Sequence, residues 1–335
     1  MPLTILPRPS TAPNVRGAAE PCRAADHLTI ALVNNMPDSA LESTAAQFSR
    51  LLRAASGSLP VQLRFCYTPE VPRGADALDH VTRVYWPIDA LWQQPIDGLI
   101  VTGTEPKAAR LDDEPYWCRL QQLLEWASAQ TFSSIWSCLA AHAAVQLLDG
   151  VERQRLDQKR FGVFEHRLVG AHPLLDGVRA PMFTPHSRWN ELPVSALRAC
   201  RYTIVSASVD TGADLFVKSA GSLLVFFQGH PEYDETTLLK EFRRDVGRFV
   251  RGERPDYPAL PRGYLSERAA AILDEFRERT LANPSADLLA TFPMDSAARC
   301  LQNTWSAAAA RIYSNWLALI AAAKWPQGMA LASRV

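Results

Sequence analysis

A cysteine lies where an apolar run meets a segment rich in helix-forming residues. Residues 133–137 have the character of a buried strand, and the small residues of 139–148 favour a helix. Cys138 therefore occupies the strand–nucleophile–helix turn on which many hydrolases and transferases carry their nucleophile. A helix N-terminus favours the thiolate, and the N–H of Leu139 is placed to bind an oxyanion. The alternative is that Cys138 is a packed core residue, because free cysteines are often buried.

A histidine and a glutamate two residues apart follow a second apolar strand. Residues 222–228 are followed by Gly229 and then by His230-Pro231-Glu232. A proline keeps the residue before it extended, and side chains two residues apart in an extended chain point to the same side. Glu232 is therefore expected to orient the imidazole of His230 as a general base. An incidental ion pair in a surface turn is the alternative.

These side chains need a sheet to hold them, and the first half of the chain has the pattern of one. Apolar, strand-like runs alternate with helix-like segments: strands are expected at 28–34, 61–67, 99–101 and 133–137, and helices at 40–55, 115–129 and 139–148. Such alternation with short connections predicts an α/β fold with a doubly wound, mostly parallel sheet of the flavodoxin-like kind.

The second half of the chain changes in character. Strands are expected at 162–169, 203–209, 214–218 and 222–228, as an antiparallel extension or edge of the sheet, and helices at 234–251, 264–281 and 296–323. We expect a disordered N-terminal arm over 1–26, an α/β domain over 27–252, and a helical C-terminal extension over 253–335 packed on the same domain.

Composition excludes several classes of protein. The 335 residues contain 35 Lys and Arg against 35 Asp and Glu, and this balance argues against nucleic-acid binding. No apolar run approaches the roughly 18 residues of a membrane span. The six scattered cysteines do not form a disulfide framework, which suggests a cytoplasmic protein. The seven histidines show no metal-ligand spacing, and a site built from His142, His186 and His230 is disfavoured. His142 is expected to pack or to form a hydrogen bond.

Several short motifs accompany the cysteine and the His-x-Glu pair in a fixed order. They are Asn34-Asn35-Met36-Pro37, Gly98-Leu99-Ile100-Val101-Thr102-Gly103, Tyr116-Trp117, Phe161-Gly162-Val163-Phe164-Glu165-His166, Pro185-His186-Ser187-Arg188, Gly229-His230-Pro231-Glu232-Tyr233-Asp234, Phe242-Arg243-Arg244-Asp245 and Asn315-Trp316-Leu317. From about Leu28 to about Ile320 the chain resembles the homoserine O-acyltransferase family of the homoserine O-succinyltransferase type, within the class I glutamine amidotransferase-like superfamily.

The resemblance implies acyl transfer in two steps in methionine biosynthesis. An acyl group passes from acyl-CoA to Cys138 as a thioester and then to the hydroxyl of L-homoserine, with His230 as base and Glu232 as its partner. The substrate-contacting positions of the family correspond to Lys159, Ser187 and Arg244. The resemblance also implies a homodimer, with acyl-CoA as a co-substrate and no bound cofactor.

Two further roles concern the acyl group. Gly103, at the end of a strand beside the cysteine turn, is expected to supply a second oxyanion N–H together with Leu139. The family position that selects the acyl donor corresponds to Lys107. A lysine there favours succinyl-CoA over acetyl-CoA, because its ammonium attracts the terminal carboxylate of the succinyl group.

The chain departs from the family pattern close to the site. Asp38-Ser39 stands where the family has lysine, Leu139 and His142 replace a tryptophan and a glutamine, and the loop 104–107 differs. An O-acetyltransferase, a serine O-acyltransferase, an amidotransferase-like hydrolase and a non-catalytic relative therefore remain as alternatives. The complete set of Cys138, His230 and Glu232 argues against the last.

Overall fold

A central sheet of nine strands organises the computed structural model, which describes residues 3–6, 8 and 26–326. Its strands follow the order β1-β3-β2-β5-β6-β13-β12-β9, with β4 beside β3. Their bounds are β1 Leu3–Leu6, β2 Leu28–Val33, β3 Val61–Tyr67, β4 Trp86–Pro87, β5 Gly98–Val101, β6 Ser133–Ser137, β9 Thr203–Ile204, β12 Leu215–Ala220 and β13 Ser222–Phe227. The pairs from β1 to β13 are parallel, whereas β12 pairs antiparallel with β13 and β9. The predicted α/β fold with a mostly parallel sheet is confirmed.

The strands that carry the nucleophile and the base are immediate neighbours. β6 and β13 pair in parallel, and Ser137 lies opposite Phe227. The carboxyl ends of parallel strands meet at one edge of the sheet, where α/β proteins place their sites. Cys138 and the turn around His230 therefore leave the sheet at the same edge and side by side.

Helices cover both faces of the sheet. The helices are α1 Leu41–Ser56, α2 Ala75–Val84, α3 Trp117–Gln130, α4 Leu139–Asp149, α5 Val194–Ala199, α6 Thr237–Val250, α7 Glu267–Ala282, α8 Ala286–Ala290, α9 Met294–Ala298 and α10 Ser306–Lys324. One face packs against α1 and α10, through residues such as Phe48 and Trp316. The other face packs against α3 and α4, through residues such as Leu123 and Val145. Such burial on both faces explains why β5 is apolar along its whole length and β2 is apolar apart from Thr29.

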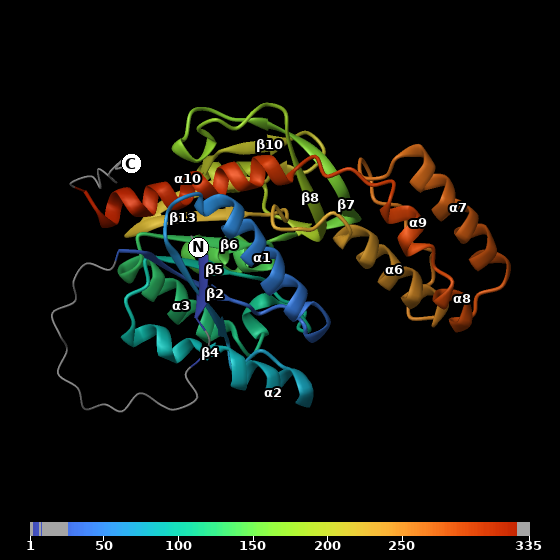
Figure 1. Cartoon of the computed structure of the whole chain (residues 1–335), viewed down its shortest axis with the longest axis horizontal. Coiled ribbons are helices and arrows are strands. Elements are labelled where there is room, and N and C mark those ends of the chain that lie inside the picture. The colour runs from blue at the N-terminus through green and yellow to red at the C-terminus, as the bar shows by residue number, and fades with distance from the viewer. Residues whose placement is uncertain (1–2, 7, 9–25, 327–335) are drawn as a thin grey trace.

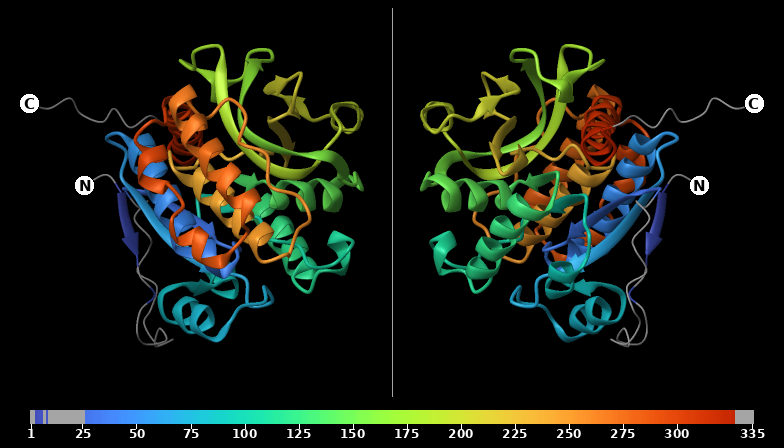
Figure 2. Two further views of the ribbon diagram at one scale, coloured as in Figure 1. Left: turned by 90° about the vertical axis from the view of Figure 1, so that its right-hand side faces the viewer. Right: turned by 90° about the vertical axis from the view of Figure 1, so that its left-hand side faces the viewer.

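A second sheet of four antiparallel strands stands beside the first. Its order is β11-β10-β7-β8, with β7 at Gln154–Leu168, β8 at Met182–Glu191, β10 at Ser206–Ser208 and β11 at Gly212–Ala213. β7 and β8 form a long curved ribbon (Figure 2). The sequence analysis did not expect β8, because Pro185 lies in it. A proline is tolerated here because β8 is an edge strand, with β7 on one side only.

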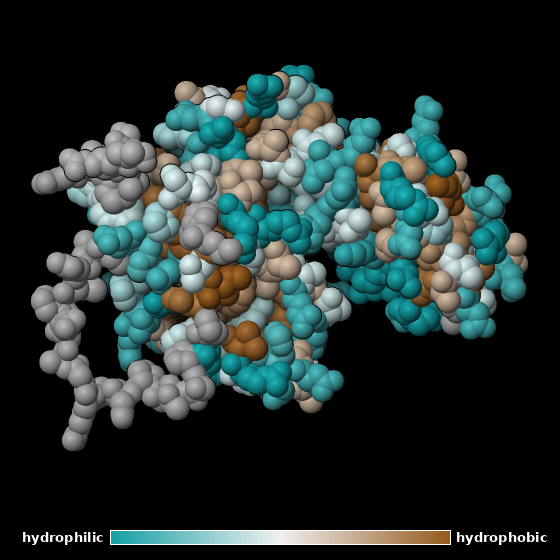
Figure 3. All heavy atoms as spheres, in the orientation of Figure 1, coloured by the Kyte–Doolittle hydropathy of each residue, from teal (hydrophilic) through white to brown (hydrophobic). Residues whose placement is uncertain are grey.

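The helices that follow β13 in sequence pack in two places, a separate lobe and the face of the main sheet. α7, α8 and α9 pack with α6 around a separate cluster that includes Phe242, Leu273 and Phe276, and form a lobe at the side of the molecule (Figure 1). The face of this lobe in Figure 3 mixes hydrophilic and hydrophobic residues. α10 instead returns to the main sheet and lies against α1. The boundary expected at residue 252 thus separates α6 from the helices it packs with, because their apolar faces complete one core.

Two segments differ from expectation near the N-terminus. Leu3–Leu6 pairs in parallel with β3, so these four residues are a strand and not part of a disordered arm. Residues 9–25, which make up most of the expected arm, lie outside the described residues. The sequence analysis assigned no element to the segment that forms α2. Only Val81 is buried in this helix, so its apolar signal is weak. No helix in the described ranges has the length and apolar character needed to cross a membrane.

Candidate active site

Cys138 sits on a strained turn between β6 and α4. Its backbone has φ 54° and ψ −113°, in the left-handed half of the Ramachandran map that residues other than glycine rarely adopt. The backbone N–H of Cys138 donates a hydrogen bond to the Phe227 carbonyl oxygen over 2.7 Å, which ties the turn to β13. This is the geometry of a nucleophile elbow, which presents the side chain above the edge of the sheet. The thiol is partly exposed and lines a cavity.

The two predicted oxyanion residues are in contact beside the thiol. A Cβ atom on Gly103 would lie 2.8 Å from the Leu139 Cβ and 3.0 Å from the Leu139 nitrogen, so only glycine fits there. Both residues line the same cavity as Cys138. Leu139 is the first residue of α4, and its N–H has no acceptor within the helix. The arrangement brings the two backbones together at the place where an oxyanion would form.

His230 and Glu232 form the expected pair. The Nδ1 atom of His230 lies 2.8 Å from Oε1 of Glu232, and both side chains are buried. The backbone N–H of His230 donates to the Pro185 carbonyl oxygen of β8, and its ring stacks on Tyr233 with the centroids 4.3 Å apart. With Nδ1 bonded to the carboxylate, Nε2 is the nitrogen left for proton transfer.

The electrostatics of His230 favour its protonated form in the free protein. Burial acts to lower the pKa of His230, but the charges of Cys138 and Glu232 outweigh burial and hold the pKa well above 6.5. A thiolate and an imidazolium side by side stabilise one another in this way, as in enzymes with a cysteine nucleophile. The three predicted catalytic residues are therefore adjacent, in the order Cys138, His230 and Glu232.

The cavity beside Cys138 has a volume of about 690 Å³. Residues of the main sheet, the second sheet and the helical lobe line it. The predicted substrate residues Lys159 on β7, Ser187 on β8 and Arg244 on α6 line it. Lys107 does not line it, and its side chain is exposed. The expectation that Lys107 contacts an acyl carboxylate therefore does not hold. The carboxylate of Glu114 binds the backbone N–H groups of Lys107 and Ala108, at 2.5 and 2.7 Å, and this contact fixes the course of the loop.

Two carboxylates that the sequence analysis did not single out hold the substrate side together. Asp245 lies between two cations, 3.0 Å from Lys159 Nζ and 3.1 Å from Arg244 Nη2. These cations keep the pKa of Asp245 below its ordinary value although burial alone would raise it. Glu241 accepts hydrogen bonds from the hydroxyls of Ser187 and Tyr233.

A sequence signal for these two residues existed. Glu241 and Asp245 stand four residues apart in α6, the spacing that places both on one face of a helix.

His142 is buried, as the preferred packing or hydrogen-bonding role requires. Its Nε2 atom lies 3.0 Å from Oε1 of Gln228, which also accepts a hydrogen bond from the backbone N–H of Leu192. Burial, reinforced by the nearby charge of Arg188, lowers the pKa of His142 to about 3. His142 is therefore a neutral hydrogen-bond donor that joins α4 to the end of β13.

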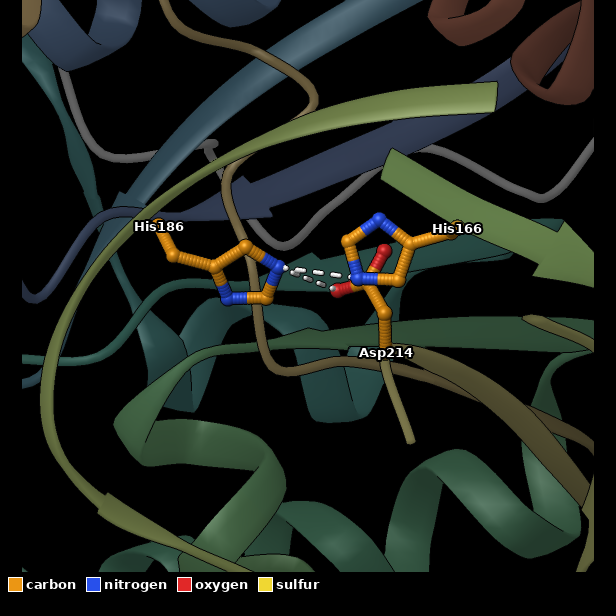
Figure 4. A group of neighbouring side chains, drawn as sticks. All are labelled: His166, His186 and Asp214. Atoms are coloured by element: carbon orange, nitrogen blue, oxygen red, sulfur yellow. Dashed lines mark hydrogen bonds and ion pairs between the residues drawn. The ribbon is translucent and has the colours of Figure 1, made fainter. Parts of the chain in front are cut away.

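A different group of side chains meets the geometric requirement for a metal site. His166, His186 and Asp214 are buried and offer ligand atoms within 4.8 Å of one another (Figure 4). Arg188 Nε donates to His186 Nδ1 over 3.2 Å, so His186 carries its proton on Nε2, which faces His166 Nε2 at 3.3 Å. His166 Nδ1 in turn faces the Phe164 carbonyl oxygen at 3.0 Å.

Hydrogen bonding accounts for this cluster better than a cation does. A metal ion would have to replace the Nε2 proton of His186 close to the guanidinium of Arg188. Burial and the charge of Arg188 already hold the pKa of His186 well below its ordinary value, so the ring is neutral. Asp214 accepts from the backbone N–H of Gly229 over 2.8 Å. The cluster thus holds the turn that carries His230.

Sequence comparison places these features in a known family. The profile of the family described as "HTS: Homoserine O-succinyltransferase" matches residues 15–326. The chain belongs to the homoserine O-succinyltransferase family. It is 45% identical over 306 residues to the homoserine O-succinyltransferase of Methylorubrum extorquens, covering 91% of each chain. The resemblance inferred from the motifs is confirmed.

Two further homoserine O-succinyltransferases agree with this assignment. The homoserine O-succinyltransferase of Rhodopseudomonas palustris is 42% identical and covers 93% of this chain and 94% of its own. The corresponding protein of Bradyrhizobium japonicum is 45% identical and covers 85% of this chain and 87% of its own. A solved glutamine amidotransferase from Methylobacillus flagellatus is similar at 16% identity, with a TM-score of 0.47, and covers 88% of this chain and 95% of its own.

Proposed function

We propose that this protein is a homoserine O-succinyltransferase that moves a succinyl group from succinyl-CoA, through a thioester on Cys138, to the hydroxyl of L-homoserine. The observation that carries the proposal is the elbow cysteine, beside a buried His230–Glu232 pair, in a cavity that Lys159, Ser187 and Arg244 also line. The family membership supports the reaction. The cytoplasm as location and a homodimer as assembly remain predictions.

In the first step the thiolate of Cys138 attacks the carbonyl carbon of the acyl-CoA thioester. The N–H groups of Leu139 and Gly103 hold the developing oxyanion. The bond from the carbonyl carbon to the CoA sulfur breaks, and CoA leaves as a thiolate that takes the proton from the imidazolium of His230. The products are the Cys138 thioester, free CoA and a neutral His230.

Formation of the thioester turns His230 from an acid into a base. The charge of Cys138 helps to raise the pKa of His230 in the free protein, and acylation removes that charge. In the second step Nε2 of His230 accepts the hydroxyl proton of homoserine while the oxygen attacks the thioester carbon. The ester forms, the bond to the Cys138 sulfur breaks, and the thiolate–imidazolium pair is restored. The carboxylate of Glu232 holds the ring in one orientation through both steps.

The substrate side of the cavity suits a zwitterionic amino acid. It offers two cations, Lys159 and Arg244, and two carboxylates, Glu241 and Asp245, within one connected network. The guanidinium of Arg244 is a forked donor for the homoserine carboxylate, and the carboxylate of Glu241 is an acceptor for its ammonium group. Because the network is balanced, a zwitterion binds without leaving a net charge buried.

The test separates the two half-reactions. Protein mixed with succinyl-CoA alone should release CoA and gain one succinyl group on Cys138, as seen by intact mass and peptide mapping. Homoserine added afterwards should remove that group and yield O-succinylhomoserine. Cys118→Ala is the matched control, because Cys118 is an exposed cysteine that does not line the cavity. Release of free succinate without ester, or of ammonia from glutamine, would instead indicate a hydrolase or an amidotransferase.

A further inference from the structure

Arg153 shares a cavity with Cys138 and forms no ion pair with any residue that the structure describes. Arg153 stands between α4 and β7, in the short segment that connects the elbow helix to the second sheet. Its partly buried side chain lines the 690 Å³ cavity and also a neighbouring cavity of about 450 Å³. Arg153 therefore stands where the two cavities adjoin.

Other cations that line the cavity have partners or are exposed. Arg155, which also lines both cavities, is exposed and lies over the Trp189 ring. Lys159 and Arg244 share Asp245, and Arg248 lies 3.2 Å from Glu105. The guanidinium of Arg188 donates to the carbonyl oxygens of Asn190 and Thr211. Among the described residues, by contrast, no carboxylate lies within 4.0 Å of the Arg153 guanidinium, and no hydrogen bond from it is found.

The surroundings of Arg153 place it close to the nucleophile. Burial lowers the pKa of Arg153, whereas the neighbouring Tyr116, Cys138 and Glu114 act in the opposite direction. The hydroxyl of Tyr116 is buried and has no hydrogen-bond partner in the described part of the chain. The carboxylate of Glu114 acts on both groups, but it accepts hydrogen bonds from the backbone N–H groups of Lys107 and Ala108 and forms no ion pair with Arg153 in the described part of the chain. Unpaired cations of this kind are costly unless an anion binds.

We propose that Arg153 binds the terminal carboxylate of the succinyl group and so selects the acyl donor. This proposal rests on the proposed function and assigns to Arg153 the role that the sequence had suggested for Lys107. In a succinyl thioester on Cys138 only two methylene groups separate the carbonyl carbon from the terminal carboxylate, so that carboxylate stays within the cavity. The phosphates of CoA are separated from its sulfur by the whole pantetheine arm. A guanidinium fork close to Cys138 therefore matches the acyl carboxylate and not the phosphates.

The experiment compares two donors of equal carbon number. Succinyl-CoA carries the terminal carboxylate, and butyryl-CoA has a methyl group in its place. The rate of Cys138 acylation is measured by CoA release without homoserine, for the wild type and for Arg153→Gln, Arg153→Lys and Arg167→Gln. Arg167 is the matched control, because it is an exposed arginine of β7 that does not line the cavity.

We expect Arg153→Gln to lower kcat/KM for succinyl-CoA by about 10–100-fold, the effect of losing one charge-assisted hydrogen-bonded pair. The value for butyryl-CoA should change by less than about threefold. Arg153→Lys should retain part of the preference, and Arg167→Gln all of it.

Three results would overturn the proposal while leaving the proposed function intact. One is an equal loss for both donors, which would assign Arg153 to the CoA moiety or to folding. Another is an unchanged kcat/KM for both donors in Arg153→Gln. The third is a loss of preference in Lys107→Gln instead. Failure of the wild type to be acylated by succinyl-CoA would contradict the proposed function itself.

Discussion

The catalytic series and the substrate side of the cavity are built in different ways. Cys138 and His230 follow two neighbouring strands of one parallel sheet, and a single backbone hydrogen bond from Cys138 to Phe227 links the two strand ends. Lys159, Ser187 and Arg244 instead come from two strands of the second sheet and a helix of the lobe. Strand pairing thus sets the geometry of the chemistry, whereas packing between layers sets the geometry of recognition.

The departures from the family pattern lie around the predicted catalytic residues and not in them. They include the loop 104–107, Asp38, and Leu139 and His142 in the helix that follows Cys138. A loop at the rim of the cavity can change without disturbing the pairing of β6 with β13. If the comparison is right, variants of the catalytic series should affect both half-reactions, and variants of the substrate side only the second.

The largest effect is expected from removal of the nucleophile. Cys138→Ala should lower turnover by about 10⁴-fold or more, and no succinyl group should appear in the intact mass. The melting temperature should change little, because a small residue replaces a small one at the mouth of the cavity. Acylation of this variant at another residue would show that transfer does not depend on the elbow.

The orienting carboxylate should have the next largest effect. Glu232→Gln keeps the volume of the side chain but removes its charge, and we expect turnover to fall by about 10²–10⁴-fold in both half-reactions. A fall confined to the second half-reaction, or one smaller than about threefold, would mean that Glu232 does not orient His230 in both steps.

The Glu232→Gln variant should also change how the free energy of unfolding depends on pH. Because the pKa of His230 is raised above 6.5 in the folded protein, its charge stabilises the fold fully below pH 6.5 and less as the pH rises through the higher folded value. The difference in unfolding free energy between wild type and Glu232→Gln should therefore shrink as the pH rises. Denaturant titrations over a range of pH measure it.

On the substrate side, Arg244→Gln should act on homoserine alone. We expect kcat/KM for homoserine to fall by about tenfold, a modest effect because the side chain is 46% exposed and solvent screens its charge. Acylation by succinyl-CoA should be unchanged. Arg243→Gln is the control, since the neighbouring Arg243 is exposed and does not line the cavity. A slower first half-reaction in Arg244→Gln would contradict the proposal that the substrate side acts only in the second half-reaction.

The smallest effect concerns His142, which links α4 to the end of β13 and has no part in either proposed reaction step. Its pKa is about 3 in the folded protein against 6.5 when unfolded, so the unfolded chain binds more protons below pH 6.5 and folding weakens as the pH falls. Between pH 7 and pH 5 the wild type should lose about 2 kcal/mol relative to His142→Gln. Equal losses in both proteins, measured by urea unfolding, would mean that His142 is protonated when folded.

Much of the main sheet and the catalytic series could be predicted from local patterns. β3 and β6 occupy the expected residues, and β2, β5 and α4 differ from expectation by only one or two residues at an end. A buried parallel strand is apolar throughout, and a cysteine between such a strand and a helix has few other conformations available. Cys138, His230 and Glu232 were found because each is defined by neighbours close in sequence.

The substrate side could be predicted only in part, because its contacts join residues far apart in the chain. Lys159 and Asp245 are 86 residues apart, and Ser187 and Glu241 are 54 apart. Strand β8 was missed because Pro185 weakens its pattern, and the donor role was placed on Lys107 because sequence does not tell which way a loop side chain points.

Local sequence alone therefore determined the α/β alternation, the elbow and the His-x-Glu pair, since strand burial, helix initiation and the restriction before proline act over a few residues. Tertiary structure decided which charges meet. The lobe brings Arg244 and Asp245 to Lys159, and the segment before β7 places Arg153 in the cavity of Cys138 with no ion pair among the described residues. The physical reason is that an ion pair depends on distance in space, and only the packing of the two sheets and the lobe sets that distance.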